Sequence, residues 1–161
     1  MTSEPDVTLD GHCTCGAVRY RLTARPMFVH CCHCTWCQRE SGSAFALNAI
    51  VEEANVDLVE GTVAETDLPS NSGKGQTRTH CPDCGVTLWS KYHAMPARVR
   101  FVRVGTLDDP TAVAPDIHIY TSTKQPWVAL PDDVPAVEEF YRLSKTWPAD
   151  SLERFQAVRD T

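Results

Sequence analysis

Eight cysteines, all of them in three short blocks, constrain this chain of 161 residues more than any other feature. The blocks are CTCG at residues 13–16, CCHCTWC at residues 31–37 and CPDCG at residues 81–85. Thiols at spacings such as C-C, C-x-C and C-x-x-C are poorly placed to form several independent disulfides. They are well placed to bind a metal through sulfur, and zinc is the ion that such spacings favour. We therefore expect bound zinc rather than disulfides.

Length and charge narrow the class of protein. A chain of 161 residues suits one main core, so we take residues 1–161 as a single domain. The net charge of −6 disfavours a nucleic-acid partner, because phosphate binding needs a basic surface. No apolar run is long enough to span a membrane, and the polar N-terminal segment has no secretion signal. We expect a cytoplasmic protein, whose thiols stay reduced, and the sequence does not indicate its oligomeric state.

Short apolar segments separated by turn residues predict a mainly β chain. We expect strands at residues 17–24, 43–52, 56–65, 86–93, 97–107 and 117–123. The Ser- and Gly-rich segment 68–79 predicts a loop or hairpin turn. Helical patterns occur at residues 136–145 and 149–160, and a single helical turn is expected after Cys34. The order of these elements predicts antiparallel sheets with a short C-terminal helix.

The first cysteine group joins two blocks that are far apart in the sequence. Cys13 and Cys15 supply one pair of thiols, and Cys81 and Cys84 supply the other. A glycine follows each pair and lets the backbone turn under a bound ion. Four thiolates complete a tetrahedral shell with no position left for a substrate, so we expect a structural zinc. Its binding energy is partly folding energy, because the unfolded chain has no preformed site.

The second cysteine group offers only three thiolates on one tight turn, and it consists of Cys32, Cys34 and Cys37. A fourth protein ligand is not evident, because Cys31 and His33 adjoin ligands and should point the other way in extended backbone. His30 is the remaining candidate. Three protein ligands with an open fourth position are typical of catalytic zinc. The alternative is a second closed site, completed by Cys31 or a histidine, in a non-catalytic zinc module that binds a protein partner.

Five segments occur in a characteristic order over roughly residues 9–141, namely HCTCGAVRY, CHCTWCQRESGSAF, HCPDCGVTLW, RVGTLDDP and HIYTSTKQPWVALPDDVPAVEEF. Their order and spacing resemble the GFA family, which is named after the glutathione-dependent formaldehyde-activating enzyme and includes the domain of centromere protein V. The resemblance implies a single GFA-type domain with a β-tent-like, zinc-stapled scaffold. It also implies two zinc ions per chain, a structural one on Cys13, Cys15, Cys81 and Cys84 and a catalytic one on Cys32, Cys34 and Cys37.

The family reaction is the formation of S-(hydroxymethyl)glutathione from glutathione and formaldehyde, and it is classed with the carbon–sulfur lyases. This chain departs from the family pattern at Cys31, which is extra to C-x-C-x-x-C. Free cysteines are often buried as small hydrophobic side chains, and a spare thiol that competes for the open zinc position is the other interpretation.

Ligand type agrees with this reaction on general grounds. A zinc ion held by three thiolates has a net negative charge, so it acidifies bound water less than zinc held by neutral ligands. A soft ligand, such as a thiol bound as thiolate, suits the site better. Attack of that thiolate on an aldehyde gives a hemithioacetal, and the reverse step cleaves the C–S bond. We expect a zinc-dependent carbon–sulfur lyase that acts on thiol–aldehyde adducts, with a small-molecule thiol such as glutathione and an aldehyde as its partners.

Several other side chains could assist the second cysteine group, and each also has an ordinary structural interpretation. His30 and His33 could transfer a proton, and Ser41 and Ser43 could donate hydrogen bonds. Cations that could bind the carboxylates of glutathione are Arg98 and Arg100 on one strand face, Arg103 on the other, and Lys124. Trp36 and Trp127 could form walls of the site or serve as packing residues.

Overall fold

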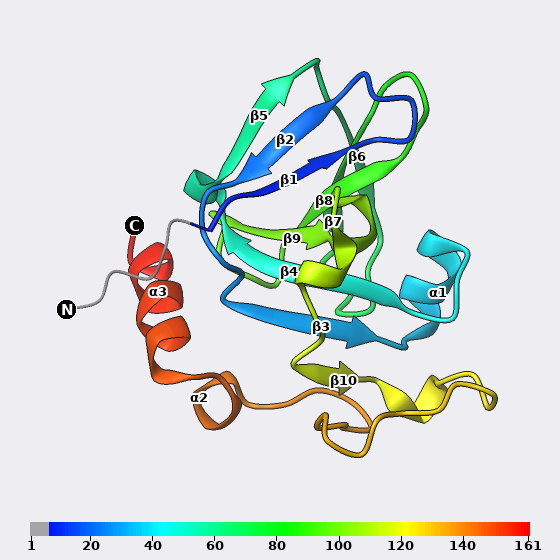
Figure 1. Cartoon of the computed structure of the whole chain (residues 1–161). Helices are drawn as coiled ribbons and strands as arrows, with labels where there is room; N and C mark the ends of the chain where they lie inside the picture. Colours follow the sequence, from blue (N-terminus) through cyan, green and yellow to red (C-terminus); the bar gives the residue numbers. More distant parts are fainter. Residues whose placement is uncertain (1–6) are drawn as a thin grey trace.

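The computed structural model describes residues 7–161, which form two β-sheets with few helices (Figure 1). The smaller sheet has three strands in the order β1-β2-β5, and the larger has seven in the order β10-β3-β4-β9-β8-β7-β6. The strands are β1 Leu9–His12, β2 Arg19–Leu22, β3 Phe28–Cys32, β4 Ala46–Glu52, β5 Val56–Glu60, β6 Ala64–Leu68, β7 Gln76–His80, β8 Thr87–Tyr92, β9 Val99–Arg103 and β10 Ile117–Ile119.

Helices are short in this part of the chain. They are α1 Thr35–Ser41, α2 Leu143–Thr146 and α3 Ala149–Arg159, with 3-10 turns η1 Glu53–Asn55, η2 Val104–Thr106, η3 Pro110–Ala112 and η4 Thr121–Thr123. The prediction of a mainly β fold with a short C-terminal helix is confirmed. Within residues 7–161, no helix combines the length and the hydropathy that a membrane crossing requires.

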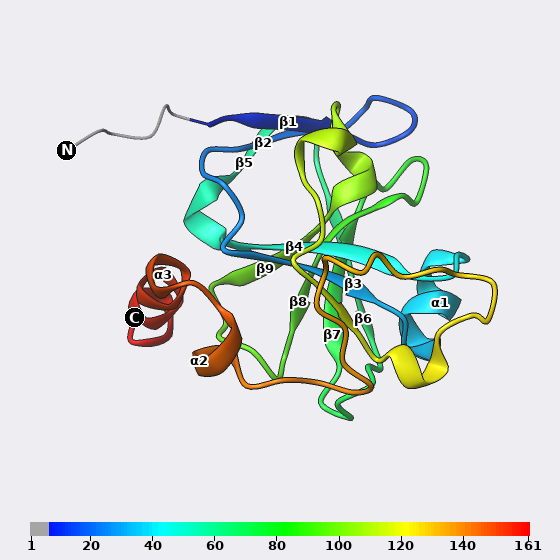
Figure 2. The ribbon, with the colours of Figure 1, turned by 60° about the horizontal axis from the view of Figure 1, so that its bottom comes forward.

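Strand β4 separates two apolar cores. Its residues alternate between them, because Ala49 and Val51 pack into one core and Ala46 and Ile50 pack into the other. Burial of both faces accounts for the long apolar run in this strand. Figure 2 shows the smaller sheet lying over one face of the larger sheet, and the first core, which includes Tyr20, fills the space between them. The second core contains the second cysteine group itself, Cys32, Cys34 and Cys37.

Strand β3 places that group. It is fully buried, since it pairs antiparallel with β4 on one side and parallel with β10 on the other. Phe28 packs into the second core and Val29 into the first, so the two faces of β3 are inside different cores. Alternation then directs His30 and Cys32 toward the second core and Cys31 away from it. The chain leaves β3 at Cys32 and turns into α1, as expected for the segment after Cys34.

One predicted strand and one predicted loop differ from the observed elements in an informative way. The expected strand at 56–65 is two strands, β5 and β6, which belong to different sheets. Gly61 has φ +83° between them, and a Cβ atom there would lie 2.1 Å from the carbonyl oxygen of Ala17. The predicted loop at 68–79 contains β7, a strand with the polar sequence QTRTH. It pairs with β6 on one side and with β8 on the other. Strands β1 and β3 were not predicted.

The predicted helix at 136–145 is wrong. Only its last part is helical, in α2, and the rest runs as extended chain beside β10. The backbone N–H of His118 donates to Pro135, and that of Tyr120 donates to the carbonyl of Glu139. These bonds satisfy the free edge of β10, which outweighs the helical propensity of the segment. The helix predicted at 149–160 is confirmed as α3.

Candidate metal centres

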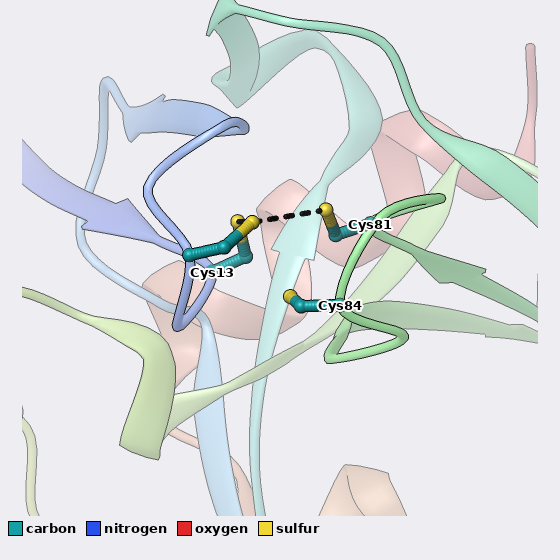
Figure 3. Close-up of side chains that lie close together, drawn as sticks. Cys13, Cys81 and Cys84 are labelled. Carbon is teal, nitrogen blue, oxygen red and sulfur yellow. Dashed lines mark hydrogen bonds between the residues drawn. The ribbon is translucent and has the colours of Figure 1, made fainter.

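Four cysteine sulfurs from two distant loops meet between the sheets. The Sγ atoms of Cys13, Cys15, Cys81 and Cys84 all lie within 4.8 Å of one another. Cys15 Sγ lies 3.5 Å from Cys13 Sγ and 3.7 Å from Cys81 Sγ. Zinc–sulfur bonds of about 2.3 Å in a tetrahedron place sulfurs about 3.8 Å apart, so this group fits a zinc ion. Figure 3 shows the side chains of Cys13, Cys81 and Cys84 pointing toward one another.

The two loops that carry these sulfurs have the same local design. In one loop the N–H of Cys13 donates to the carbonyl of Val18, and in the other the N–H of Cys81 donates to Val86. Each loop closes with a glycine at positive φ, +77° at Gly16 and +74° at Gly85. Glycine adopts this conformation without steric cost. The backbone therefore folds each loop around its sulfurs and leaves them free to bind an ion.

The second cysteine group lies where β3 ends and α1 begins. The Sγ atoms of Cys32, Cys34 and Cys37 lie within 4.8 Å of one another, and all three residues are buried. Cys34 is the N-cap of α1, and its sulfur accepts a hydrogen bond of 3.3 Å from the N–H of Cys37. Within residues 7–161, no fourth Cys, His, Asp or Glu side chain joins the group. The expected C-x-C-x-x-C cluster is thus assembled with three sulfurs.

The three thiols of this group differ in the direction of their pKa shifts. Hydrogen bonds from the thiols of Cys32 and Cys37 lower the pKa of Cys34 to about 3. The hydrogen bond with Cys34, the one with Cys37 and burial raise the pKa of Cys32 far above its usual value. The opposite directions mean that one sulfur carries the charge while its neighbours keep their protons. A full set of three thiolates needs a cation among them, and thiolate is the form that binds zinc.

A pocket of about 300 Å³ opens at this group. Its wall includes all three sulfur-bearing residues together with His30, Trp36, Glu40, Asn48, Ser70, Asn71, Ser72, Gln76, Tyr92, Ala94, Met95, Phe101, Ile119, Tyr120 and Phe140. The side chains come from six strands, α1 and several loops that are far apart in the sequence. Sequence reasoning identified the sulfurs, His30 and Trp36, but missed the other wall residues, because strand register and the path of residues 136–142 decide which aromatic rings face the sulfurs.

His30 is the histidine that lies in the pocket wall. Its Nε2 atom makes a 2.5 Å hydrogen bond with the hydroxyl of Tyr141, which also accepts a hydrogen bond from the indole N–H of Trp147. Burial lowers the pKa of His30 to about 4, so its imidazole is neutral at neutral pH. A neutral imidazole bonded to a hydroxyl can pass a proton between the two groups.

Cys31, His33 and His118 form a third buried cluster. Cys31 Sγ lies 3.5 Å from His33 Nε2, which lies 2.9 Å from His118 Nδ1. Two imidazole nitrogens on one zinc stand about 3.3 Å apart at Zn–N distances near 2.05 Å. The shorter separation is that of a hydrogen bond, so we interpret this cluster as a histidine pair beside a buried thiol. Cys31, at 2% exposure, therefore matches the expectation of a buried side chain rather than a competing ligand.

The predicted carboxylate-binding cations lie outside the pocket wall. Arg100 pairs with Glu53, and the Lys124 ammonium donates to two backbone carbonyls in its own loop. Arg103 is buried close to the second cysteine group, and its guanidinium donates to Glu40 Oε1 at 2.6 Å and to Asn48 Oδ1.

The remaining candidates divide between structural roles and the pocket. The Ser41 hydroxyl donates to the carbonyl of Cys37 at 2.7 Å, and the backbone N–H of Ser43 donates to that hydroxyl. Both serines therefore stabilise the end of α1. Trp36 lies in the pocket wall, whereas Trp127 is 74% exposed and is not part of it.

Comparison with known proteins agrees with the geometry. A family model described as "Glutathione-dependent formaldehyde-activating enzyme" matches residues 8–123, which include both cysteine groups. This mainly β chain with clustered thiols belongs to the GFA family. A Halomonas elongata protein named "Putative glutathione-dependent formaldehyde-activating enzyme" is 25% identical over 128 residues, which cover 76% of this chain and 80% of that protein. A crystal structure of a Rhodobacter sphaeroides protein aligns with TM-score 0.48 and 18% identity over 80% of this chain and 99% of the other.

Proposed function

We propose that this protein is a zinc-dependent carbon–sulfur lyase that makes or cleaves thiol–aldehyde adducts, in the manner of an S-(hydroxymethyl)glutathione synthase. The observation that carries the proposal is the position of Cys32, Cys34 and Cys37 in the wall of a pocket. A substrate can reach these sulfurs, whereas the residues of the four-cysteine group do not line this pocket. A purely structural zinc site needs no open cavity beside its metal.

We assign one zinc ion to each cysteine group, with a structural role for the first and a catalytic role for the second. The four sulfurs of Cys13, Cys15, Cys81 and Cys84 satisfy all tetrahedral positions and join β1 to the loop between β7 and β8. The three sulfurs of the second group leave one position for a ligand from the pocket. Zinc bound there would supply affinity for a soft sulfur ligand and lower the pKa of a substrate thiol.

The protein's own residues prepare the pocket for this chemistry. The N–H groups at the start of α1 donate to Cys34 and hold its sulfur in place. The positive charge of Arg103 lies near Cys37 and lowers the electrostatic cost of gathering three thiolates. Aromatic side chains exclude water, which would otherwise compete with a thiol for the aldehyde. His30 Nε2, bonded to Tyr141, is the candidate to hold the proton that moves onto the hydroxyl of the adduct.

Zinc content and X-ray absorption test the proposal directly. We expect two zinc ions per wild-type chain, one with four sulfur ligands and one with three sulfurs and a lighter atom. Cys34→Ser should lose one zinc, remain folded and lose turnover of formaldehyde with a thiol. The matched control is Cys31→Ala, which removes a thiol on the other face of the same strand and should keep both ions. Two all-sulfur sites, or one zinc in the wild type, would remove the basis for a catalytic site.

A further inference from the structure

The wall of the pocket at Cys32, Cys34 and Cys37 is mostly apolar. Beyond the sulfurs, its large side chains are Trp36, Tyr92, Met95, Phe101, Tyr120 and Phe140. Tyr92 and Phe101 meet edge to face with ring centroids 4.8 Å apart, which gives the interior a rigid aromatic surface. Phe140 is 44% exposed and Trp36 is 42% exposed, so these two rings stand at the opening. Such a surface recognises a ligand by contact with apolar area.

The polar groups of the wall are mostly engaged already. Asn48 Oδ1 accepts from Arg103, and Gln76 Nε2 donates to Glu40 Oε2 at 2.8 Å. Ser70 Oγ lies 3.0 Å from Ser72 Oγ and accepts from a backbone N–H in the same loop. Gln76 Oε1 is buried and, among the described residues, has no hydrogen-bond partner. This free atom is an acceptor, so it suits a hydroxyl or another donor and repels a carboxylate.

The charges around the pocket have the wrong sign for an acidic ligand. Within residues 7–161, Glu40 and His30 are the only acidic or basic side chains in the wall besides the thiols, and no lysine or arginine lines it. Arg103, whose charge lies near Cys37, is already paired with Glu40, and both side chains are 12% exposed. Glutathione carries two carboxylates and one ammonium group. A carboxylate placed against this wall would lose its water and find no free cation to replace it.

We infer that the thiol taken by this pocket is a small apolar thiol, aryl or alkyl, rather than glutathione. The inference rests on the proposed function for the position of the thiol sulfur, which is placed at the three-cysteine group. It rests on the pocket wall for the chemistry of the rest of the thiol molecule. In the reaction the thiol S–H adds across the aldehyde C=O. The S–C bond forms, the carbonyl π electrons move to oxygen, and that oxygen takes the proton. The new hydroxyl is a donor, and Gln76 Oε1 is an unpartnered acceptor in the same wall.

The first experiment compares two thiols on the full chain loaded with zinc. Binding of phenylmethanethiol and of glutathione is measured by calorimetry without aldehyde, and turnover of each is then measured with formaldehyde. We expect phenylmethanethiol to bind at least tenfold more tightly and to have the higher kcat/KM. Equal or tighter binding of glutathione would overturn the inference. Preferred binding of phenylmethanethiol without turnover of any thiol would support the inference about the pocket and refute the proposed reaction. Preferred turnover of glutathione would support the proposed reaction and refute the inference about the pocket.

Three variants separate the pocket wall from direct binding of sulfur to zinc. Phe140→Ala removes an aromatic ring at the opening and should weaken phenylmethanethiol binding several-fold. Asn71→Arg adds a cation to the exposed part of the wall and should strengthen glutathione binding several-fold. Trp127→Ala removes an exposed aromatic ring outside the wall and should change neither affinity. Each variant is accepted only with wild-type zinc content, and equal behaviour of all three would contradict the inference.

Discussion

Replacement of Arg103 by methionine should destabilise the protein strongly. Arg103 and Glu40 are both 12% exposed, and the guanidinium donates to the carboxylate at 2.6 Å. Arg103→Met keeps much of the apolar stem but leaves the Glu40 carboxylate buried without its cation, next to a group of cysteine sulfurs. Loss of one partner of a buried pair costs about 3–5 kcal/mol. Since a domain is stable by only about 5–15 kcal/mol, the change removes a large fraction of the total.

The assay is urea unfolding of zinc-loaded protein, followed by far-ultraviolet circular dichroism. Glu40→Gln/Arg103→Met should be more stable than Arg103→Met alone, because the double variant buries no unpaired charge. Gln at this position can still bond to Gln76, which donates to Glu40 in the wild type. A loss below about 1 kcal/mol in Arg103→Met would place the pair with ordinary surface ion pairs and refute the reasoning. A double variant no more stable than the single one would refute it as well.

Three further predictions concern backbone, pH and metal. Gly61→Ala should cost several kcal/mol, since its Cβ would lie 2.1 Å from a carbonyl oxygen, whereas Gly73→Ala has open space and should cost about 1 kcal/mol for its positive φ alone; equal losses in urea unfolding would contradict this. Burial raises the pKa of the Glu52 carboxyl, but hydrogen bonds, chiefly from Arg154, lower it overall. The pairing of Glu52 with Arg154 therefore stabilises the folded protein at pH values above the pKa that this carboxyl has in the unfolded chain. This stabilisation is lost as the pH falls through the pKa of the folded state. The stability difference between wild type and Glu52→Gln should shrink in acid; a constant difference would contradict it. Cys84→Ser or a strong chelator should lower the Tm by tens of degrees, because structural zinc contributes about 10–16 kcal/mol in small zinc domains; an unchanged Tm would argue against a structural ion.

Sequence reasoning succeeded where spacing alone fixes geometry. Cys32, Cys34 and Cys37 lie within six residues on one tight turn and can all reach one ion, so their cluster was predictable. The glycines after Cys15 and Cys84 marked the two loops of the other cluster, because positive φ there is needed for a tight turn. Alternation along extended backbone also favoured a position for Cys31 outside the cluster, although the sequence left open that Cys31 completes a closed site.

Prediction of secondary structure failed for segments whose conformation depends on contacts with residues far away in the sequence. The segment 136–142 has helical spacing, yet it lies along the free edge of β10 and brings Phe140 to the pocket. No local signal reveals that edge, since β10 itself has only three residues. The sequence of β7 predicts a loop, because its polar side chains lack the apolar alternation that marks a half-buried strand. The apolar character of the pocket depends on these pairings, so it could not be predicted from the cysteine motif.

Because side chains alternate between the two faces of β3, the register of this strand determines which cysteine can bind the metal. Cys31 and Cys32 are chemically equal and adjacent, and the pairings Cys32–Ala46 and Cys32–Ile119 decide which one faces the other two sulfurs. A slip of one residue would exchange every side chain between the two cores. An ion captured early by Cys31, Cys34 and Cys37 would hold the strand in that wrong register as a kinetic trap. Correct maturation therefore favours pairing of β3 before zinc arrives, and a Cys31→Val chain should refold faster in excess zinc than the wild type.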